Sequence, residues 1–202
     1  MKIILDNKLL DSIDTRSSKY VPYVMPEDSY FHHHSGREHY RLLMYLSQQF
    51  DNVDFIELGI HRGASSLSLS TNKNNQVHCF DIKPTIPEIL KNLGFDNIKN
   101  IHPTITDVLK TDQYNEKILN SALIFLDTNH DGIFETNFYN LLVKNNYSGI
   151  LMMDDIHHEE YPELREVWNK TITHPKIDIT KYGHWSGTGL VMFNKNIEII
   201  QR

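Results

Sequence analysis

The sequence predicts an α/β protein built on a parallel sheet. Short apolar runs with little polar alternation recur along the chain, and segments with helical spacing of apolar residues lie between them. Strands buried on both faces have this continuous apolar pattern, and intervening helices are typical of a parallel sheet. The expected strands are Val53–Leu58, Val77–Ile82, Ile98–Ile101, Ala122–Asp127 and Gly149–Asp154, followed by Ile177–Thr180 and Gly187–Phe193.

The expected helices fall between these strands. The first begins at Ser35, because Ser35 and Glu38 have the spacing of a capping box and apolar residues at helical spacing follow. Prolines and mixed polar residues interrupt any period in residues 1–34, so we expect an irregular N-terminal arm there and a single domain over residues 35–202. The other expected helices are Ser65–Ser70, Pro87–Leu93, Asn115–Leu119, Phe134–Val143 and Leu164–Ile172.

Composition narrows the class of protein. The chain has 202 residues, a net charge of −6 and one cysteine, Cys79. The acidic balance argues against a nucleic-acid-binding protein, and a lone cysteine excludes an internal disulfide framework. The sequence contains no apolar run long enough for a signal peptide or a membrane span, so we expect a cytoplasmic protein with no membrane partner.

A glycine-containing turn follows the first expected strand. Glu57 stands near the end of that strand, Gly59 and Gly63 allow backbone to approach a ligand closely, and Ser65 opens the next helix. The dinucleotide-binding fingerprint requires glycine at the position of His61, so this turn does not predict a dinucleotide site. The acid at Glu57 indicates a ligand with a positively charged group.

The second expected strand leads into another acid, Asp81. A carboxylate at the end of this strand suits a ribose, because it accepts hydrogen bonds from both hydroxyl groups. Together with the glycine turn, Asp81 predicts a nucleoside ligand at the carboxyl edge of the sheet.

Acidic residues also end two later strands. Asp127 closes one strand and is followed by His130, and the pair Asp154 and Asp155 closes the next. Because the carboxyl ends of parallel strands lie together, we expect these carboxylates to converge, where without a counter-charge they would repel one another. A divalent cation removes that repulsion, and oxygen ligands suit Mg²⁺ or Mn²⁺.

In this order the motifs resemble the metal-dependent branch of the class I S-adenosylmethionine-dependent O-methyltransferases, which includes sugar- or macrolide-type and catechol-type members. Glu57-x-Gly59-x-x-x-Gly63-x-Ser65 resembles the first motif of that family, and Asp154-Asp155 resembles its metal-binding acid pair. The segment from Asp127 to His130 resembles its D-x-D-H segment, with Asn129 in place of the second acid. The resemblance spans roughly residues 35–193 and implies a three-layer Rossmann-like methyltransferase fold, with a mostly parallel seven-stranded sheet whose last strand is antiparallel.

The resemblance also implies where S-adenosylmethionine binds. Its methionine end would lie over Gly59 and Gly63, close to Ser65, with Glu57 near the ammonium group. Asp81 would bind the ribose. Asp107, in the segment Thr106-Asp107-Val108, would belong to the adenine pocket.

The resemblance implies a metal centre beside this cofactor. Asp127, Asp154 and Asp155 would hold Mg²⁺ or Mn²⁺. Asp127 and His130 are the candidate catalytic residues. His130 would act as the general base, because an imidazole is suited to accept a proton near neutral pH.

The expected function is therefore divalent-metal-dependent methyl transfer from S-adenosylmethionine to a hydroxyl group. The acceptor would be a small molecule or a glycan, and a sugar hydroxyl is preferred because the acid pattern is closer to the sugar-modifying members. One alternative is a non-haem iron oxygenase that uses His157 or His158 with Asp154 and Asp155. The other is a cofactor-binding module without catalysis.

Overall fold

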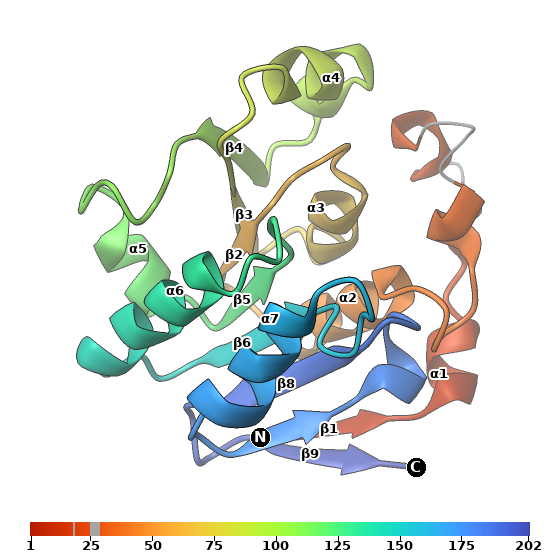
Figure 1. The fold of residues 1–202 in the computed structure, drawn as a ribbon. Helices are drawn as coiled ribbons and strands as arrows, with labels where there is room; N and C mark the ends of the chain where they lie inside the picture. Colours follow the sequence, from red (N-terminus) through yellow and green to blue (C-terminus); the bar gives the residue numbers. More distant parts are fainter. Residues whose placement is uncertain (18, 25–28) are drawn as a thin grey trace.

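The structure is a computed structural model that describes residues 1–17, 19–24 and 29–202. Its main sheet has the strand order β4-β3-β2-β5-β6-β8-β7, and β8 is antiparallel to both of its neighbours while the other pairings are parallel (Figure 1). This confirms the prediction of a mostly parallel seven-stranded sheet with a reversed last strand. The strands are β1 (Lys2–Leu5), β2 (Asp54–Leu58), β3 (Gln76–Asp81), β4 (Ile101–Ile105), β5 (Leu123–Leu126), β6 (Ile150–Asp154), β7 (Lys176–Asp178), β8 (Thr188–Met192) and β9 (Glu198–Gln201).

Helices cover both faces of this sheet, as the sequence predicts. The segment expected as one helix over Leu164–Ile172 divides into α7 and a π-helical turn, η4. The helices are α1 (Asn7–Asp11), α2 (Tyr40–Gln49), α3 (Ala64–Leu69), α4 (Ile86–Asn92), α5 (Asn115–Asn120), α6 (Ile133–Lys144) and α7 (Pro162–Glu166). The shorter turns are η1 (Val21–Tyr23), η2 (Ser29–His32), η3 (Phe95–Asn97), η4 (Val167–Thr171) and η5 (Thr180–Tyr182).

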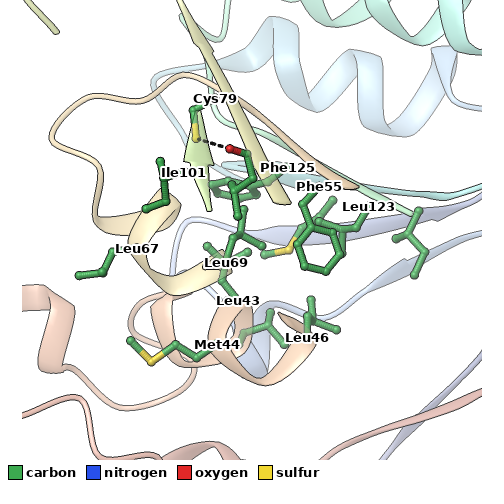
Figure 2. Close-up of a cluster of buried hydrophobic side chains, with 14 of the residues drawn as sticks. Leu43, Met44, Leu46, Phe55, Leu67, Leu69, Cys79, Ile101, Leu123 and Phe125 are labelled. Atoms are coloured by element: carbon green, nitrogen blue, oxygen red, sulfur yellow. Dashed lines mark hydrogen bonds between the residues drawn. The ribbon is translucent and has the colours of Figure 1, made fainter. Parts of the chain in front are cut away.

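The core has one hydrophobic cluster on each face of the sheet, because successive strand residues point to opposite sides. In β5, Leu123 and Phe125 pack into the cluster beneath α2, α3 and α4, whereas Ile124 and Leu126 pack into the cluster beneath α5, α6 and α7. Figure 2 shows part of the first cluster, in which side chains of α2 and α3 join residues from the strands. Burial on both faces explains why the strands read as continuous apolar runs.

The N-terminal segment differs from the expected irregular arm. Residues 2–5 form β1, which pairs in parallel with β9 near the end of the chain, and α1 follows directly. Ile3, Leu5 and Leu10 are fully buried and belong to the same core cluster as α2. Four-residue strands at the two ends of the chain carry too little local pattern to be predicted. Among the described residues, no helix has the length and apolarity required to cross a membrane.

Two element boundaries also differ from the prediction. Ser35 does not cap a helix: its amide and hydroxyl both donate to Asp11 Oδ1, and α2 begins only at Tyr40. The strand expected at Ile98–Ile101 instead occupies Ile101–Ile105 and contains Pro103. Proline is tolerated there because β4 is an edge strand of the main sheet.

The strand order leaves a crevice at one position of the sheet edge. The chain runs from β2 outward to β3 and β4, and then returns to β5 on the other side of β2. At such a reversal the loops after neighbouring strands diverge and leave a crevice at the carboxyl edge of the sheet. The glycine turn after β2 and the Asp127 segment after β5 meet at this crevice.

Candidate active site

A cavity of about 890 Å³ opens at this crevice. Most of the residues expected to bind the cofactor or the metal line it, and they come from the loops after β2, β3, β4 and β5. The predicted residues in its wall are Gly59, Ser65, Asp81, Asp107, Asp127 and His130. Fold and sequence motif therefore agree on the place of the site.

The glycine turn brings the backbone after β2 against the backbone after β5. Gly59 has φ +94°, and a Cβ atom there would lie 1.7 Å from the carbonyl oxygen of Asp127. Gly63 has φ +80° and would place a Cβ 2.7 Å from side-chain atoms of Phe95 and Leu90. Both positions require glycine for space and for backbone conformation, and the close approach at Gly59 keeps the floor of the cavity narrow.

Asp81 both lines the cavity and holds the glycine turn. Its Oδ2 accepts a hydrogen bond from the Ile60 amide at 2.9 Å, and its Oδ1 accepts one from the Lys83 amide at 2.8 Å. A carboxylate has about four acceptor positions, so Asp81 retains capacity for hydroxyl donors. Asp107 has a similar arrangement, with Oδ1 accepting from the Leu109 amide and Oδ2 lying 3.0 Å from Lys110 Nζ.

Glu57 lies behind the glycine turn rather than in the cavity wall. Its side chain is fully buried on the α3 side of the sheet, where it accepts a hydrogen bond from the Ser66 hydroxyl, and its Oε1 has no partner. Glu57 is therefore not among the residues that line the cavity, where a contact with a ligand's ammonium group was expected. Burial raises the pKa of Glu57 to about 7, although hydrogen bonds from Ser65 and Ser66 act in the opposite direction.

We expect Glu57→Gln to stabilise the protein at alkaline pH. A carboxyl whose pKa is raised from its ordinary value of 4.5 to about 7 binds more protons folded than unfolded, so the free energy of unfolding falls as pH rises through this range. The shift corresponds to about 3 kcal/mol at pH 8, and glutamine resembles the protonated acid. Urea unfolding at pH 5 and pH 8 measures it. Glu116→Gln, on the exposed face of α5, is the control, and equal pH dependence of all three proteins would contradict the assignment.

Two clusters of possible metal ligands adjoin the cavity, since His39, Asp127 and His130 line it. Asp127, His130 and Asp155 form the first, here called the Asp127 cluster. His130 Nε2 lies 3.3 Å from Asp127 Oδ1 and 3.3 Å from Asp155 Oδ2. His130 and Asp155 have φ of 59° and 58°, a left-handed conformation that is uncommon outside glycine. Backbone in sparsely populated conformations often occurs at functional sites, and here it occurs in two loops that supply possible metal ligands.

His39, Asp154 and His184 form the second group, here called the His39 cluster. Asp154 Oδ2 lies 3.1 Å from His39 Nδ1 and 3.2 Å from His184 Nδ1. The three expected metal ligands are thus divided: Asp127 and Asp155 share one cluster, and Asp154 belongs to the other. Asp154 is the last residue of β6, and the chain turns at Asp155, where φ is 58°, so the Asp155 carboxylate reaches His130 while Asp154 lies beside His39.

The charges in these clusters shift the protonation of their members. Burial alone would lower the pKa of His39, but the carboxylates of Asp154 and Asp127 raise it above its ordinary value. The pKa of His184 is raised to about 10 against the effect of burial, chiefly by Asp154 and Asp155. The pKa of Asp154 is lowered in spite of its burial, because both imidazoles stabilise its charge. Without a metal ion, bound protons supply the positive charge that the carboxylates require.

The Asp127 cluster fits a divalent cation. Metal–ligand bonds of about 2.0–2.2 Å place neighbouring ligand atoms of one ion about 3.0–3.5 Å apart, and both His130 contacts fall in this interval. His130 Nε2 is buried and has no hydrogen-bond partner among the described residues, although two carboxylates are near. An orphaned nitrogen between two carboxylates is the arrangement expected of ligands around an ion.

His39, which the sequence does not predict as a site residue, lies in the cavity wall and in the His39 cluster. His39 directly precedes α2, and a single histidine before a helix has no spacing that relates it to residues 154 and 184. The oxygenase alternative is wrong in its ligands, because His157 Nε2 bonds to Asp178 Oδ2 at 2.6 Å and His158 stacks on Tyr161 and Trp185. Neither histidine belongs to the two clusters found among the described residues.

Known structures of this architecture include methyltransferases. Cofactor-bound Rv0187 from MTB has a TM-score of 0.62 at 13% sequence identity, over 95% of this chain and 94% of that chain. SAH-bound methyltransferase PaMTH1 from Podospora anserina has a TM-score of 0.60 at 10% identity, over 92% and 86% of the two chains. A Staphylococcus aureus protein assigned as a caffeoyl-CoA O-methyltransferase has a TM-score of 0.59 at 14% identity, over 76% and 81%.

Sequence comparison alone does not group the chain with known proteins. No protein-family model matches it, and no curated protein does. The structural matches at 10–14% identity therefore establish the architecture. The chain has the Rossmann-like methyltransferase fold, with its cavity at the carboxyl edge of the parallel strands.

Proposed function

We propose that the protein transfers a methyl group from S-adenosylmethionine to a hydroxyl group, with a divalent cation in the Asp127 cluster. One observation carries the proposal: a single cavity joins the glycine turn and Asp81 to Asp127 and His130. A nucleoside-binding half and a cation-binding half therefore open into one space, as a two-substrate transfer reaction requires.

The cofactor would occupy the half of the cavity near β2, β3 and β4. Asp81 would accept hydrogen bonds from the ribose hydroxyls, and Ile82 and Val108 offer apolar surface for a purine ring between Asp81 and Asp107. The methionine end would follow the turn from Gly59 to Gly63, where free backbone groups lie at the start of α3. These contacts orient the methyl group toward the end of β5.

The acceptor would occupy the half of the cavity near β5 and α7. In the transfer step the hydroxyl oxygen forms a bond to the methyl carbon, and the bond from that carbon to the sulfonium sulfur breaks with its electron pair remaining on sulfur. The hydroxyl proton passes to solvent water. A divalent cation held by the Asp127 cluster would lower the pKa of the acceptor hydroxyl and fix its position. The cavity would hold the two reacting groups in line.

The position of His130 favours a role as cation ligand over a role as free general base. Its Nε2 is the atom that lies between Asp127 and Asp155, and its ring is fixed by stacking on Tyr161 with centroids 4.7 Å apart. We therefore propose that Asp127, His130 and Asp155 together hold the cation. Mg²⁺ or Mn²⁺ remains the proposed ion, and the imidazole favours Mn²⁺ of the two.

We propose a sugar or glycan hydroxyl as the acceptor. The acceptor half contains polar groups from Asn129, Asp131 and Asn137 beside the ring of Tyr161, a mixture that suits a hydroxylated ring. Trp185 lies near His158 and has 59% of its surface exposed. An exposed indole offers a face on which the apolar side of a sugar can pack.

Calorimetry with S-adenosylmethionine tests the function directly. We expect binding without added metal, and methyl transfer to a panel of sugar and phenolic acceptors only with Mg²⁺ or Mn²⁺. A cofactor-binding module without catalysis would bind and transfer to no acceptor in the panel. Absence of S-adenosylmethionine binding would overturn the proposal.

Asp81→Ala is expected to weaken S-adenosylmethionine binding by about 10- to 100-fold, the effect of losing a charge-assisted hydrogen bond of roughly 1.5–3 kcal/mol. Because Asp81 also holds the glycine turn, calorimetry should compare S-adenosylhomocysteine with its 2′-deoxy analogue. The wild type should prefer the ribose form, and the variant should lose that preference. Asp112→Ala, an exposed acid outside the cavity, is the control. An unchanged preference in Asp81→Ala would contradict the ribose contact.

A further inference from the structure

The His39 cluster contains a buried nitrogen that no neighbour satisfies. The His39 side chain is only 5% exposed, and its Nδ1 has no hydrogen-bond partner among the described residues although Asp154 Oδ2 lies 3.1 Å away. A buried polar atom without a partner is costly and calls for an explanation such as an ion. We propose that His39, Asp154 and His184 form a second cation site, which takes a divalent transition metal.

The distances support a shared ion rather than simple ion pairs. Asp154 Oδ2 is 3.1 Å from His39 Nδ1 and 3.2 Å from His184 Nδ1, and the three ligand atoms all lie within 4.8 Å of one another. Ligands of one metal ion at about 2.0–2.2 Å have this separation.

Ordinary histidine–aspartate pairs elsewhere in the chain have different geometry. His157 Nε2 lies 2.6 Å from Asp178 Oδ2, and His78 Nε2 lies 3.0 Å from Asp54 Oδ1, and both contacts are hydrogen bonds. The contact of His39 with Asp154 has no such geometry. Proximity without a hydrogen bond is the relation expected of two ligands of one ion.

The surroundings of His184 also favour metal binding. Three oxygen atoms lie close to its Nδ1: Asp154 Oδ2 and Asp155 Oδ1 at 3.2 Å, and the Ser186 hydroxyl at 2.7 Å. One N–H group cannot donate a good hydrogen bond to all three. His184 Nε2 lies 3.7 Å from Glu38 Oε2. Metal-binding histidines commonly direct their second ring nitrogen toward a carboxylate, which leaves the first nitrogen free to bind the ion.

The donor set determines which metal the site would take. Two imidazoles and one carboxylate suit transition metals such as Mn²⁺, Fe²⁺, Co²⁺ or Zn²⁺, whereas Mg²⁺ prefers oxygen ligands. Asp155 lies between the two clusters, with Oδ1 toward His184 and Oδ2 toward His130. The second ion would therefore sit beside the proposed catalytic one.

A metal at this place would join three distant parts of the chain. His39 directly precedes α2, Asp154 ends β6, and His184 lies in the loop before β8. Since an ion that binds only the folded state stabilises it, occupation should raise the melting temperature. This expectation concerns binding and stability, and it holds whether or not the protein transfers methyl groups.

Cobalt binding tests the inference. Co²⁺ is titrated into metal-free protein, the visible spectrum reports its ligands, and equilibrium dialysis gives the number of ions per chain. We expect about two Co²⁺ per chain in the wild type and a higher melting temperature with Co²⁺. His39→Phe, which keeps a ring against Phe125 and Tyr40, should weaken one of the two sites by at least about 10- to 100-fold.

Two further variants and one control complete the test. His184→Ala, at a less buried position, should lose Co²⁺ from the His39 cluster. Asp127→Asn should lose Co²⁺ from the Asp127 cluster and retain the visible spectrum of the ion in the His39 cluster. His157→Ala should retain both. One Co²⁺ per chain that His39→Phe and His184→Ala both retain would overturn the inference, and so would two ions unaffected by these substitutions.

Discussion

Replacing Asp155 by Asn is expected to lower turnover by about 10²–10³-fold or more, the effect of losing an electrostatic group at a reacting centre. Asp155 belongs to the Asp127 cluster and also lies 3.2 Å from His184 of the His39 cluster, and it accepts a hydrogen bond from Ser186. The affinity for S-adenosylmethionine should change little, because the cofactor half of the cavity lies on other strands. Methyl-transfer rates at saturating cofactor, together with calorimetry for S-adenosylmethionine and Mn²⁺, measure both effects.

The substitution is suitable because asparagine tolerates the left-handed backbone at this position, where φ is 58°. A loss of activity would therefore reflect the missing charge and not a distorted loop. Asp178→Asn is the matched control, since Asp178 also contacts a histidine but belongs to neither cluster. Treatment with EDTA should reproduce the loss, and re-addition of Mn²⁺ should restore the wild-type rate. Methyl transfer that survives EDTA would refute metal dependence.

Replacing His130 by Ala is expected to lower turnover by about 10²–10⁴-fold, the range for removal of a positioned general base. A cation ligand gives a loss of similar kind, so the rate alone does not identify the role. Affinity for Mn²⁺ separates the two: it falls if His130 is a ligand, as its position between two carboxylates indicates, and stays constant if His130 is a base. His130→Asn is the second variant, because it preserves the left-handed conformation at φ 59°.

The pH dependence provides an independent measurement for the same residue. Burial lowers the pKa of His130, but Asp127 and Asp155 together raise it above its ordinary value of 6.5 in the metal-free cluster. A proton on His130 competes with a cation, so Mn²⁺ affinity should fall by up to about tenfold per pH unit below this raised pKa. His130→Ala should show a flatter profile from pH 6 to pH 8. A variant with the wild-type slope would exclude His130 as a ligand.

Local sequence patterns predicted most strands of the main sheet and the edge at which the cavity lies. Each parallel strand is a local apolar run buried on both faces, and such a run is visible without knowledge of its neighbours. The positions of Gly59 and Asp81 were predictable as well, because each residue stands at the end of an apolar run that is recognisable as a strand. The rule that parallel strands end at one edge then placed Asp127 beside them.

Contacts between distant segments were beyond the sequence. β1 and β9 are short, and only the pairing of the two chain ends makes them strands. Ser35 has the local pattern of a helix cap, yet Asp11 takes both of its hydrogen bonds and α2 begins five residues later, at Tyr40. A helix N-cap stabilises a protein by about 1 kcal/mol, so tertiary hydrogen bonds of similar energy can outweigh the preference of Ser35 for that position.

The composition of the metal-binding clusters was decided by tertiary structure alone. The sequence indicates that acids gather at the ends of β5 and β6, but it does not indicate that Asp154 and Asp155 direct their carboxylates to different clusters. His39 and His184 enter the site from a helix start and a late loop, so no spacing in the chain relates them to Asp154. A strand fixes where its end lies, whereas a cluster of ligands depends on which side chains from separate elements meet in three dimensions.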